Sequence, residues 1–278
     1  FRIEKAKHKG SYRVFKTEYL NTELKQIYEK RIEQGETQTR ESANTSLDNF
    51  LRTQSSNMRD YADSCFRYLR ATGLINVSQV GKSLSIVPER IEDVDYLLEK
   101  IDRNPLTFES EAAYCAYLGN ARTPELFTDN KANLLEKLHT EFAGQSVSEN
   151  SSIEELKDML GDLRDERRDN NIKNEVKSIK EFKLYDDIQS VFGDIAAKKF
   201  YDNPIMLEWN TWRAMTMLDG GNIKANLNFD DFGKPLSTAA GNMADIVCDY
   251  VDFLVTVEVT MASGQKQFEM EGEPVSRH

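Results

Sequence analysis

The chain has 278 residues, a formal net charge of −11 at pH 7 and 39% hydrophobic residues. This length allows two domains of ordinary size, and the acidic balance argues against a protein that coats nucleic acid by bulk charge attraction. Three widely separated cysteines give neither a disulfide framework nor a zinc ribbon, and no apolar run reaches the length of a membrane span. We therefore expect an intracellular, cytoplasmic protein.

The first hundred residues follow the order helix, helix, helix, hairpin. Apolar residues recur at helical spacing over residues 19–33, 43–53 and 57–73, and the last helix is expected to end at Gly73. The sequence LINVSQVGKSLSIVPE then alternates apolar and polar residues about Gly81, as in a β-hairpin. This order predicts a winged-helix DNA-binding domain over residues 1–105.

The third expected helix carries three arginines that are candidates for contact with DNA. Arg59, Arg67 and Arg70 lie opposite its apolar side, where they can donate hydrogen bonds to phosphates or base edges. Arginines on a solvent-facing helix are also common without such a role. Contact with double-stranded DNA is thus one of two interpretations of these residues.

Residues 106–203 are expected to form a helical linker. Apolar residues recur every three or four positions between dense charges, most clearly after the polar break at residues 144–152. This pattern is typical of helices that pack as a hairpin or along a neighbouring domain. We see no candidate catalytic residues in it.

Residues 204–278 are expected to form a small α/β module. Pro204 suits the first turn of a helix over residues 205–219, which the glycine pair after it would end. Two strands follow, one through Asp245 and one through Glu258, and then a helix from about Lys266. The whole chain is accordingly predicted to be an α+β, multidomain protein.

Three acids in this module recur thirteen residues apart, at Asp245, Glu258 and Glu271. Glu258 lies in the apolar run of residues 253–259, where burial of an unpaired acid is costly and a bound cation would remove that cost. Carboxylate and carbonyl oxygens are the ligands that Mg²⁺ prefers. We predict that Asp245, Glu258 and the Val259 carbonyl hold Mg²⁺, and that Glu271 orients water or a second ion.

A lysine is often found two residues after the second acid of such sites, but Thr260 stands there. Its hydroxyl cannot supply the positive charge. Lys266 in the following turn, or Glu271 through part of the positioning, are the two candidates to replace it.

The stretches EWNTW, AAGNMAD, TVEVT and SGQKQFEMEGEPVSRH together resemble type IIS restriction endonucleases of the AlwI, PleI and MlyI kind and related nicking endonucleases. The run RDYADSCFRYLRATGL is similar to the winged-helix part of those enzymes. The resemblance implies a Mg²⁺-dependent nuclease of the PD-(D/E)xK fold, in which Mn²⁺ can substitute. Its acids fall on Asp245, Glu258 and Glu271, with Glu208 as a further acid near the site, and Ala244 replaces the usual proline.

The same resemblance bears on partners. One catalytic centre cuts one strand at a time, so cleavage of both strands implies a homodimer or a separate small subunit. The chain starts at Phe1 and ends at His278 within the last motif. We therefore expect a fragment that lacks much of the N-terminal recognition domain of such enzymes.

Each acid also has an ordinary explanation when it is taken alone. Glu258 can be an edge-strand acid, Asp245 a turn cap, and Glu208 and Glu271 solvated helix residues, while Trp209 and Trp212 are expected in the core. Two rival functions therefore stay open. These are a catalytically silent winged-helix DNA-binding module and a helical scaffold that binds another protein.

Overall fold

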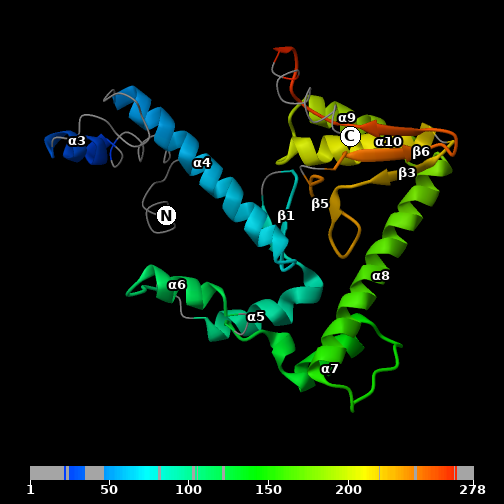
Figure 1. Ribbon diagram of the computed structural model, residues 1–278, viewed down its shortest axis with the longest axis horizontal. Coiled ribbons are helices and arrows are strands. Elements are labelled where there is room, and N and C mark those ends of the chain that lie inside the picture. Colours follow the sequence, from blue (N-terminus) through cyan, green and yellow to red (C-terminus); the bar gives the residue numbers. More distant parts are fainter. Residues whose placement is uncertain are drawn as a thin grey trace. The chain divides into compact units, whose positions relative to one another are not determined.

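The computed structural model describes residues 22, 25–34, 47–80, 83–101, 104, 106–120, 123–218, 220–240, 243–265 and 267. The chain divides into two compact units between Tyr68 and Leu69. The elements are mostly helical with small antiparallel sheets, which confirms the mixed α+β class (Figure 1). None of the helices in the described residues combines the length and apolar composition needed to cross a membrane.

Two of the expected N-terminal helices are one continuous helix. Besides α3, Lys25–Glu33, the structure has α4, Leu47–Ala71, where separate helices over 43–53 and 57–73 were predicted. The sequence Gln-Ser-Ser-Asn between them contains neither glycine nor proline, so nothing forces a break. The helix ends as expected, because Gly73 adopts a φ of 67° and donates its N–H to the Arg70 carbonyl.

The expected hairpin follows α4. Strands β1, Ile75–Val77, and β2, Leu84–Ile86, pair antiparallel, with Asn76 opposite Ser85. Its expected turn residue Gly81 lies outside the described residues. The hairpin is thus confirmed, while a winged-helix arrangement of these elements stays a prediction.

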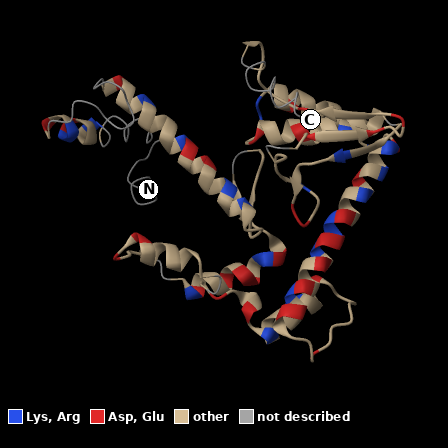
Figure 2. Ribbon diagram, viewed as in Figure 1, with Lys and Arg blue, Asp and Glu red and all other residues tan. Residues whose placement is uncertain are grey.

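The middle of the chain is helical, as predicted. Charges of both signs alternate along its longest helix, α8, so this helix offers no continuous basic surface (Figure 2). A hydrophobic cluster of Leu134, Leu138, Leu156 and Leu160 joins α7 to the start of α8. The elements are η2, Pro88–Arg90; α5, Ile91–Lys100; α6, Glu111–Leu118; η3, Phe127–Asp129; α7, Lys131–Glu141; α8, Ile153–Lys180; and α9, Tyr185–Ala196.

Within its described residues, the C-terminal module contains the helix α10 and two small antiparallel sheets. The main sheet has the strand order β3-β6-β7, and a second sheet pairs β4 with β5. The elements are α10, Asn203–Leu218; β3, Asn222–Ala225; β4, Asn228–Phe229; β5, Pro235–Ser237; β6, Ile246–Asp249; and β7, Leu254–Val257.

The core of this module lies between α10 and the main sheet. Trp209 and Trp212 on α10 are 8% and 2% exposed and belong to one buried cluster with Ile246 and Cys248 of β6. The expected core position of both tryptophans is therefore confirmed.

The run 253–259 is less buried than the sequence suggests. β7 pairs only with β6, so it is an edge strand of the described sheet, and Leu254 is 61% exposed. The apolar composition of the run by itself therefore does not indicate a buried strand. Burial begins only at the end of the strand, beside Glu258.

Candidate active site

The β6–β7 register brings Asp245 and Glu258 together. Ile246 pairs with Val257, and continuing the antiparallel register by one residue places Asp245 directly opposite Glu258. Residues that are directly opposite in an antiparallel pair project to the same face, with Cβ atoms about 5 Å apart. The Val259 N–H also donates to Asp245 Oδ2 over 2.7 Å. The end of this hairpin therefore presents two carboxylates side by side.

The neighbouring strand holds the start of β6 in position. Asn226, which directly follows β3, donates its N–H to the Asp245 carbonyl over 2.9 Å and its side-chain amide to the Ala244 carbonyl over 2.7 Å. Ala244 is 5% exposed. The backbone beneath the Asp245 carboxylate is thus fixed by both adjacent strands.

Glu208 on α10 joins these two acids. Its side chain accepts a hydrogen bond from the Ala239 N–H over 3.1 Å, and the residue is only 3% exposed. Burial raises the pKa of Glu208 to about 7, and the negative charges of Asp245, Glu258 and Asp202 add to this shift. Charges act on one another in this way only at short range, so Asp245, Glu258 and Asp202 all lie near Glu208 and make up an acid cluster around it.

Sequence reasoning missed Asp202. This residue is 4% exposed and precedes α10, where its Oδ1 atom lies 3.4 Å from the Ile205 N–H. The available signal was its position just before the Asn-Pro start of a helix, which is typical of a cap. A helix-capping role for Asp202 does not by itself reveal that its carboxylate lies near Glu208.

The donor set suits a hard divalent cation, because oxygen ligands are what Mg²⁺ prefers. Within the described residues, however, no group of three or more His, Cys, Asp or Glu converges closely enough to hold a metal ion. One oxygen of Asp245 accepts from Val259 N–H and one of Glu208 accepts from Ala239 N–H. The acids are close enough to repel one another, yet two of them face backbone donors.

Some expected site residues cannot be placed. Glu271 and Lys266 lie outside the described residues. Thr260, which replaces the usual lysine, uses its Oγ1 atom to accept a hydrogen bond from the Ala262 N–H over 3.1 Å. Besides burial, the pKa of Glu208 responds most to the carboxylates of Asp245, Glu258 and Asp202 and to the Ala239 N–H.

The three arginines of α4 have different surroundings. Arg59 and Arg67 are exposed, and Arg67 Nε lies 2.8 Å from Asp63 Oδ2 one turn earlier. Arg70 is 8% exposed and donates to the Pro235 carbonyl over 2.9 Å. Arg70 thus ties the end of α4 to β5, whereas Arg59 and Arg67 remain open to solvent.

A second buried acid has the opposite environment. The Glu141 side chain on α7 accepts hydrogen bonds from Arg90, Arg164 and Arg167 over 2.8 to 3.1 Å. Burial on its own would raise the pKa of Glu141, but Arg164 and Arg90 outweigh it and hold that pKa at about 2. Arg90 also pairs with Asp231 between β4 and β5. This network joins the helical middle to the C-terminal module.

Comparisons with known proteins identify the family of the chain. The model of the AlwI restriction endonuclease family matches residues 1–278. No curated protein matches the chain. Among solved structures, the small subunit R.BspD6I2 of the heterodimeric restriction endonuclease R.BspD6I is 32% identical over 32% of this chain. The match spans half of that subunit, and its TM-score of 0.30 supports no argument about fold. On the match over its full length, the chain belongs to the AlwI restriction endonuclease family.

Proposed function

We propose that this chain is a Mg²⁺-dependent DNA endonuclease that hydrolyses phosphodiester bonds, as a type IIS restriction enzyme or a strand-nicking enzyme does. Family membership supports DNA as the substrate. The observation that carries the proposal is the placement of Asp245 opposite Glu258, with the buried Glu208 close to both. A buried acid whose pKa is raised by neighbouring acids is typical of a functional site.

Each residue has a proposed role in this site. Asp245, Glu258 and the Val259 carbonyl hold the cation, for which Mn²⁺ can substitute, and Glu208 adds a further carboxylate. Bound Mg²⁺ supplies a Lewis acid that activates water and offsets negative charge on the phosphate. The Val259 N–H and Asn226 hold Asp245 at the end of the sheet. Glu271 is proposed to orient the attacking water.

The proposed domain order is a winged-helix DNA-binding domain over 1–105, a helical region over 106–203 and the PD-(D/E)xK catalytic domain over 204–278. Arg59 and Arg67 are the candidates for DNA contact, since both are exposed. One catalytic centre hydrolyses one strand at a time. Cleavage of both strands therefore needs a second copy of the chain or a separate small subunit.

Neither rival function accounts for the acid cluster. A silent DNA-binding module or a helical scaffold has no use for a buried glutamate beside other acids, because this arrangement costs stability at neutral pH. A hydrolytic site does use it, since a cation neutralises the carboxylates during the reaction.

The test is incubation of the protein with supercoiled plasmid and Mg²⁺. We expect conversion to open-circle or linear DNA, which EDTA and the substitution Glu258→Ala both abolish. Glu154→Ala is the matched control, because Glu154 is exposed on α8. Cleavage by Glu258→Ala at the wild-type rate, or no cleavage by the wild type with either Mg²⁺ or Mn²⁺, would contradict the proposal.

A further inference from the structure

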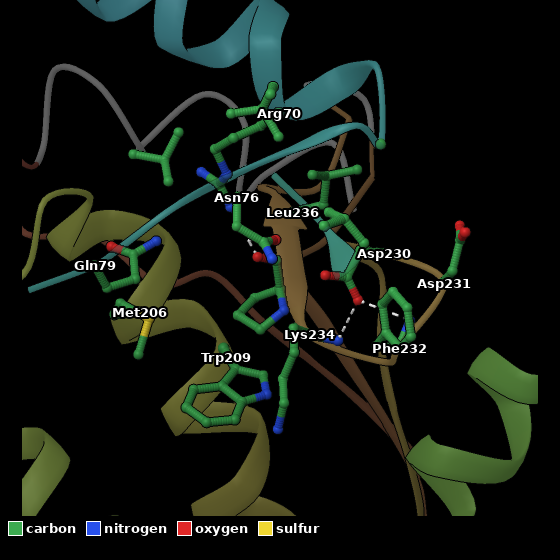
Figure 3. Close-up of a pocket in the computed structure, with 15 residues that line it drawn as sticks. Arg70, Asn76, Gln79, Met206, Trp209, Asp230, Asp231, Phe232, Lys234 and Leu236 are labelled. Atoms are coloured by element: carbon green, nitrogen blue, oxygen red, sulfur yellow. Dashed lines mark hydrogen bonds between the residues drawn. The ribbon is translucent and has the colours of Figure 1, made fainter. Parts of the chain in front are cut away.

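A cavity of about 260 Å³ lies between the β1–β2 hairpin, α10 and the β4–β5 hairpin (Figure 3). Trp209 lines it and is the residue after Glu208, so α10 bears both the cavity wall and a candidate catalytic acid. Its apolar lining includes Ile75, Val77, Val87, Met206, Trp209 and Leu236. A cavity of this size is larger than the voids that ordinary side-chain packing leaves.

The two walls that face α10 are held in place by long-range hydrogen bonds. The backbone carbonyl of Gln79, in the first hairpin, accepts a hydrogen bond from the Tyr201 N–H over 2.6 Å. The side-chain oxygen of Gln79 accepts another from the Asp202 N–H over 3.0 Å. On the other side, Arg70 binds the Pro235 carbonyl and Asn171 of α8 binds the Phe232 carbonyl. These contacts join segments far apart in the sequence, so the cavity is a built feature of the fold.

The α10 wall is fixed as well. The Arg213 guanidinium lies over the Trp209 ring, 4.2 Å from its centroid, and also binds Asn210 and Asp187. This contact holds the indole in one orientation. A rigid aromatic wall binds planar ligands without first paying the entropy of being ordered.

Polar groups stand among the apolar ones. Asn76, an exposed residue of β1, offers an amide that both donates and accepts, and Lys234 offers an exposed ammonium group (Figure 3). Amides read the edges of nucleobases, and apolar or aromatic walls contact their faces. Lysine is a common partner of phosphate. Asp230 and Asp231 line the cavity too, but Asp231 is paired with Arg90, and Asp230 accepts hydrogen bonds from the Phe232 and Lys234 N–H groups. The lining therefore matches a planar heterocycle, with Lys234 as the group that can contact its phosphate.

The volume narrows the choice. Pockets for drug-sized ligands run from roughly 300 to 1,000 Å³, so this cavity suits one ring system and not an extended molecule. Enzymes that handle nucleic acids admit such a ring by turning one base out of the stack, at a cost of a few kcal/mol. Gln79, which lines the cavity, accepts a hydrogen bond from the Asp202 N–H, and Asp202 belongs to the acid cluster, so the cavity lies near that cluster.

Resting on the proposed function, we infer that this cavity receives one unstacked nucleobase of the DNA substrate, adjacent to the phosphate at the acid cluster. Asn76 hydrogen-bonds the edge of the base, Trp209 and Met206 contact the ring, and Lys234 contacts its phosphate. The cavity is a subsite that fixes the strand relative to Glu208, Asp245 and Glu258.

The first test is binding of deoxynucleoside 5′-monophosphates to the full chain in EDTA, followed by tryptophan fluorescence. The chain has two tryptophans, and of these Trp209 lines the cavity. We expect a saturable change in emission with at least one of the four nucleotides and none with deoxyribose 5-phosphate. Asn76→Tyr, which fills the cavity, weakens binding at least 10-fold.

Asn222→Tyr is the matched control, since Asn222 is exposed on β3 and lies outside the cavity lining. It retains wild-type binding, and thermal unfolding of both variants shows that each is folded. No saturable change with any nucleotide would overturn the inference. An equal response to deoxyribose 5-phosphate would also overturn it, because that result indicates a phosphate site without a base.

A second arm measures plasmid cleavage separately. Asn76→Tyr raises KM for DNA or lowers the nicking rate at least 10-fold, while Asn222→Tyr leaves both unchanged. Because nucleotide binding needs neither Mg²⁺ nor turnover, it reports on the cavity even where the chain does not cleave. Cleavage by Asn76→Tyr at the wild-type rate and KM would contradict the subsite.

Discussion

Glu208 as a residue is 3% exposed and the side chain of Glu141 is 3% exposed, yet the pKa of Glu208 is raised to about 7 and that of Glu141 is lowered to about 2. Burial raises the pKa of both residues, so it does not explain the opposite shifts. The neighbouring charges explain them, because Glu141 has three arginines within hydrogen-bonding distance, whereas Glu208 has three other acids near it.

The two regions therefore show how to separate structural acids from functional ones. An acid surrounded by cations is a satisfied ion network that joins elements of the fold. An acid surrounded by acids lowers stability at neutral pH and is retained where a cation or substrate completes it. We propose the chemistry at Glu208, Asp245 and Glu258, whereas Glu141 belongs to the scaffold.

The largest expected effect is on catalysis. Asp245→Asn keeps the side-chain shape but removes a proposed metal ligand, so plasmid cleavage should fall by about 10³-fold or more. Asp249→Asn is the control, because Asp249 is exposed four residues further along β6. Gel assays of initial rates measure both variants. Equal losses in the two would place the effect outside the acid cluster.

Glu141→Gln should have the largest effect on stability. It leaves Arg90, Arg164 and Arg167 without their shared anion, and breaking such a buried pair costs about 3–5 kcal/mol. Urea unfolding at pH 7 measures the loss. Glu136→Gln on the exposed side of the same helix should change the free energy of unfolding by less than about 0.5 kcal/mol.

The pH dependence of that effect follows from its sign. The pKa of Glu141 is lowered in the folded state, so its contribution is present above about pH 4.5 and is lost as pH falls toward 2. The wild type and Glu141→Gln should therefore converge in stability under acid conditions. A constant difference between them down to low pH would contradict the assigned cause.

Glu208→Gln should act in the opposite direction. A raised pKa means that the wild type loses stability as pH rises from about 4.5 through 7, by an upper bound of about 3 kcal/mol. Gln keeps an acceptor for the Ala239 N–H and carries no charge. In EDTA, the variant should be more stable than the wild type at pH 8 and nearly equal at pH 4.5. If the free energies of unfolding of the two proteins changed in parallel with pH, the raised pKa of Glu208 would be ruled out.

The sequence predicted the elements of the C-terminal module better than the ion network around Glu141. The strand pattern around Asp245 and Glu258 is local, and a hairpin places residues at its open end opposite one another. The aromatic residues of α10 likewise follow a helical period. In each case short-range spacing carries the information.

The remaining features depend on contacts between distant segments. Glu141 meets Arg90 from 51 residues away, and Arg70 meets Pro235 from 165 residues away. No spacing rule pairs such residues, so the structural role of Arg70 was not predicted. The half-exposed state of β7 was missed for a similar reason, because an apolar strand does not reveal whether it has one neighbour or two.

The pKa of Glu208, measured by carbon NMR of its labelled carboxyl group with and without Mg²⁺, tests the central claim most directly. Without metal we expect a value of about 7. Saturating Mg²⁺ should bring that pKa back to the ordinary carboxylate range or lower, because the cation offsets the charges of Asp245 and Glu258. An unchanged pKa of Glu208 in saturating Mg²⁺ would contradict a metal site at these acids.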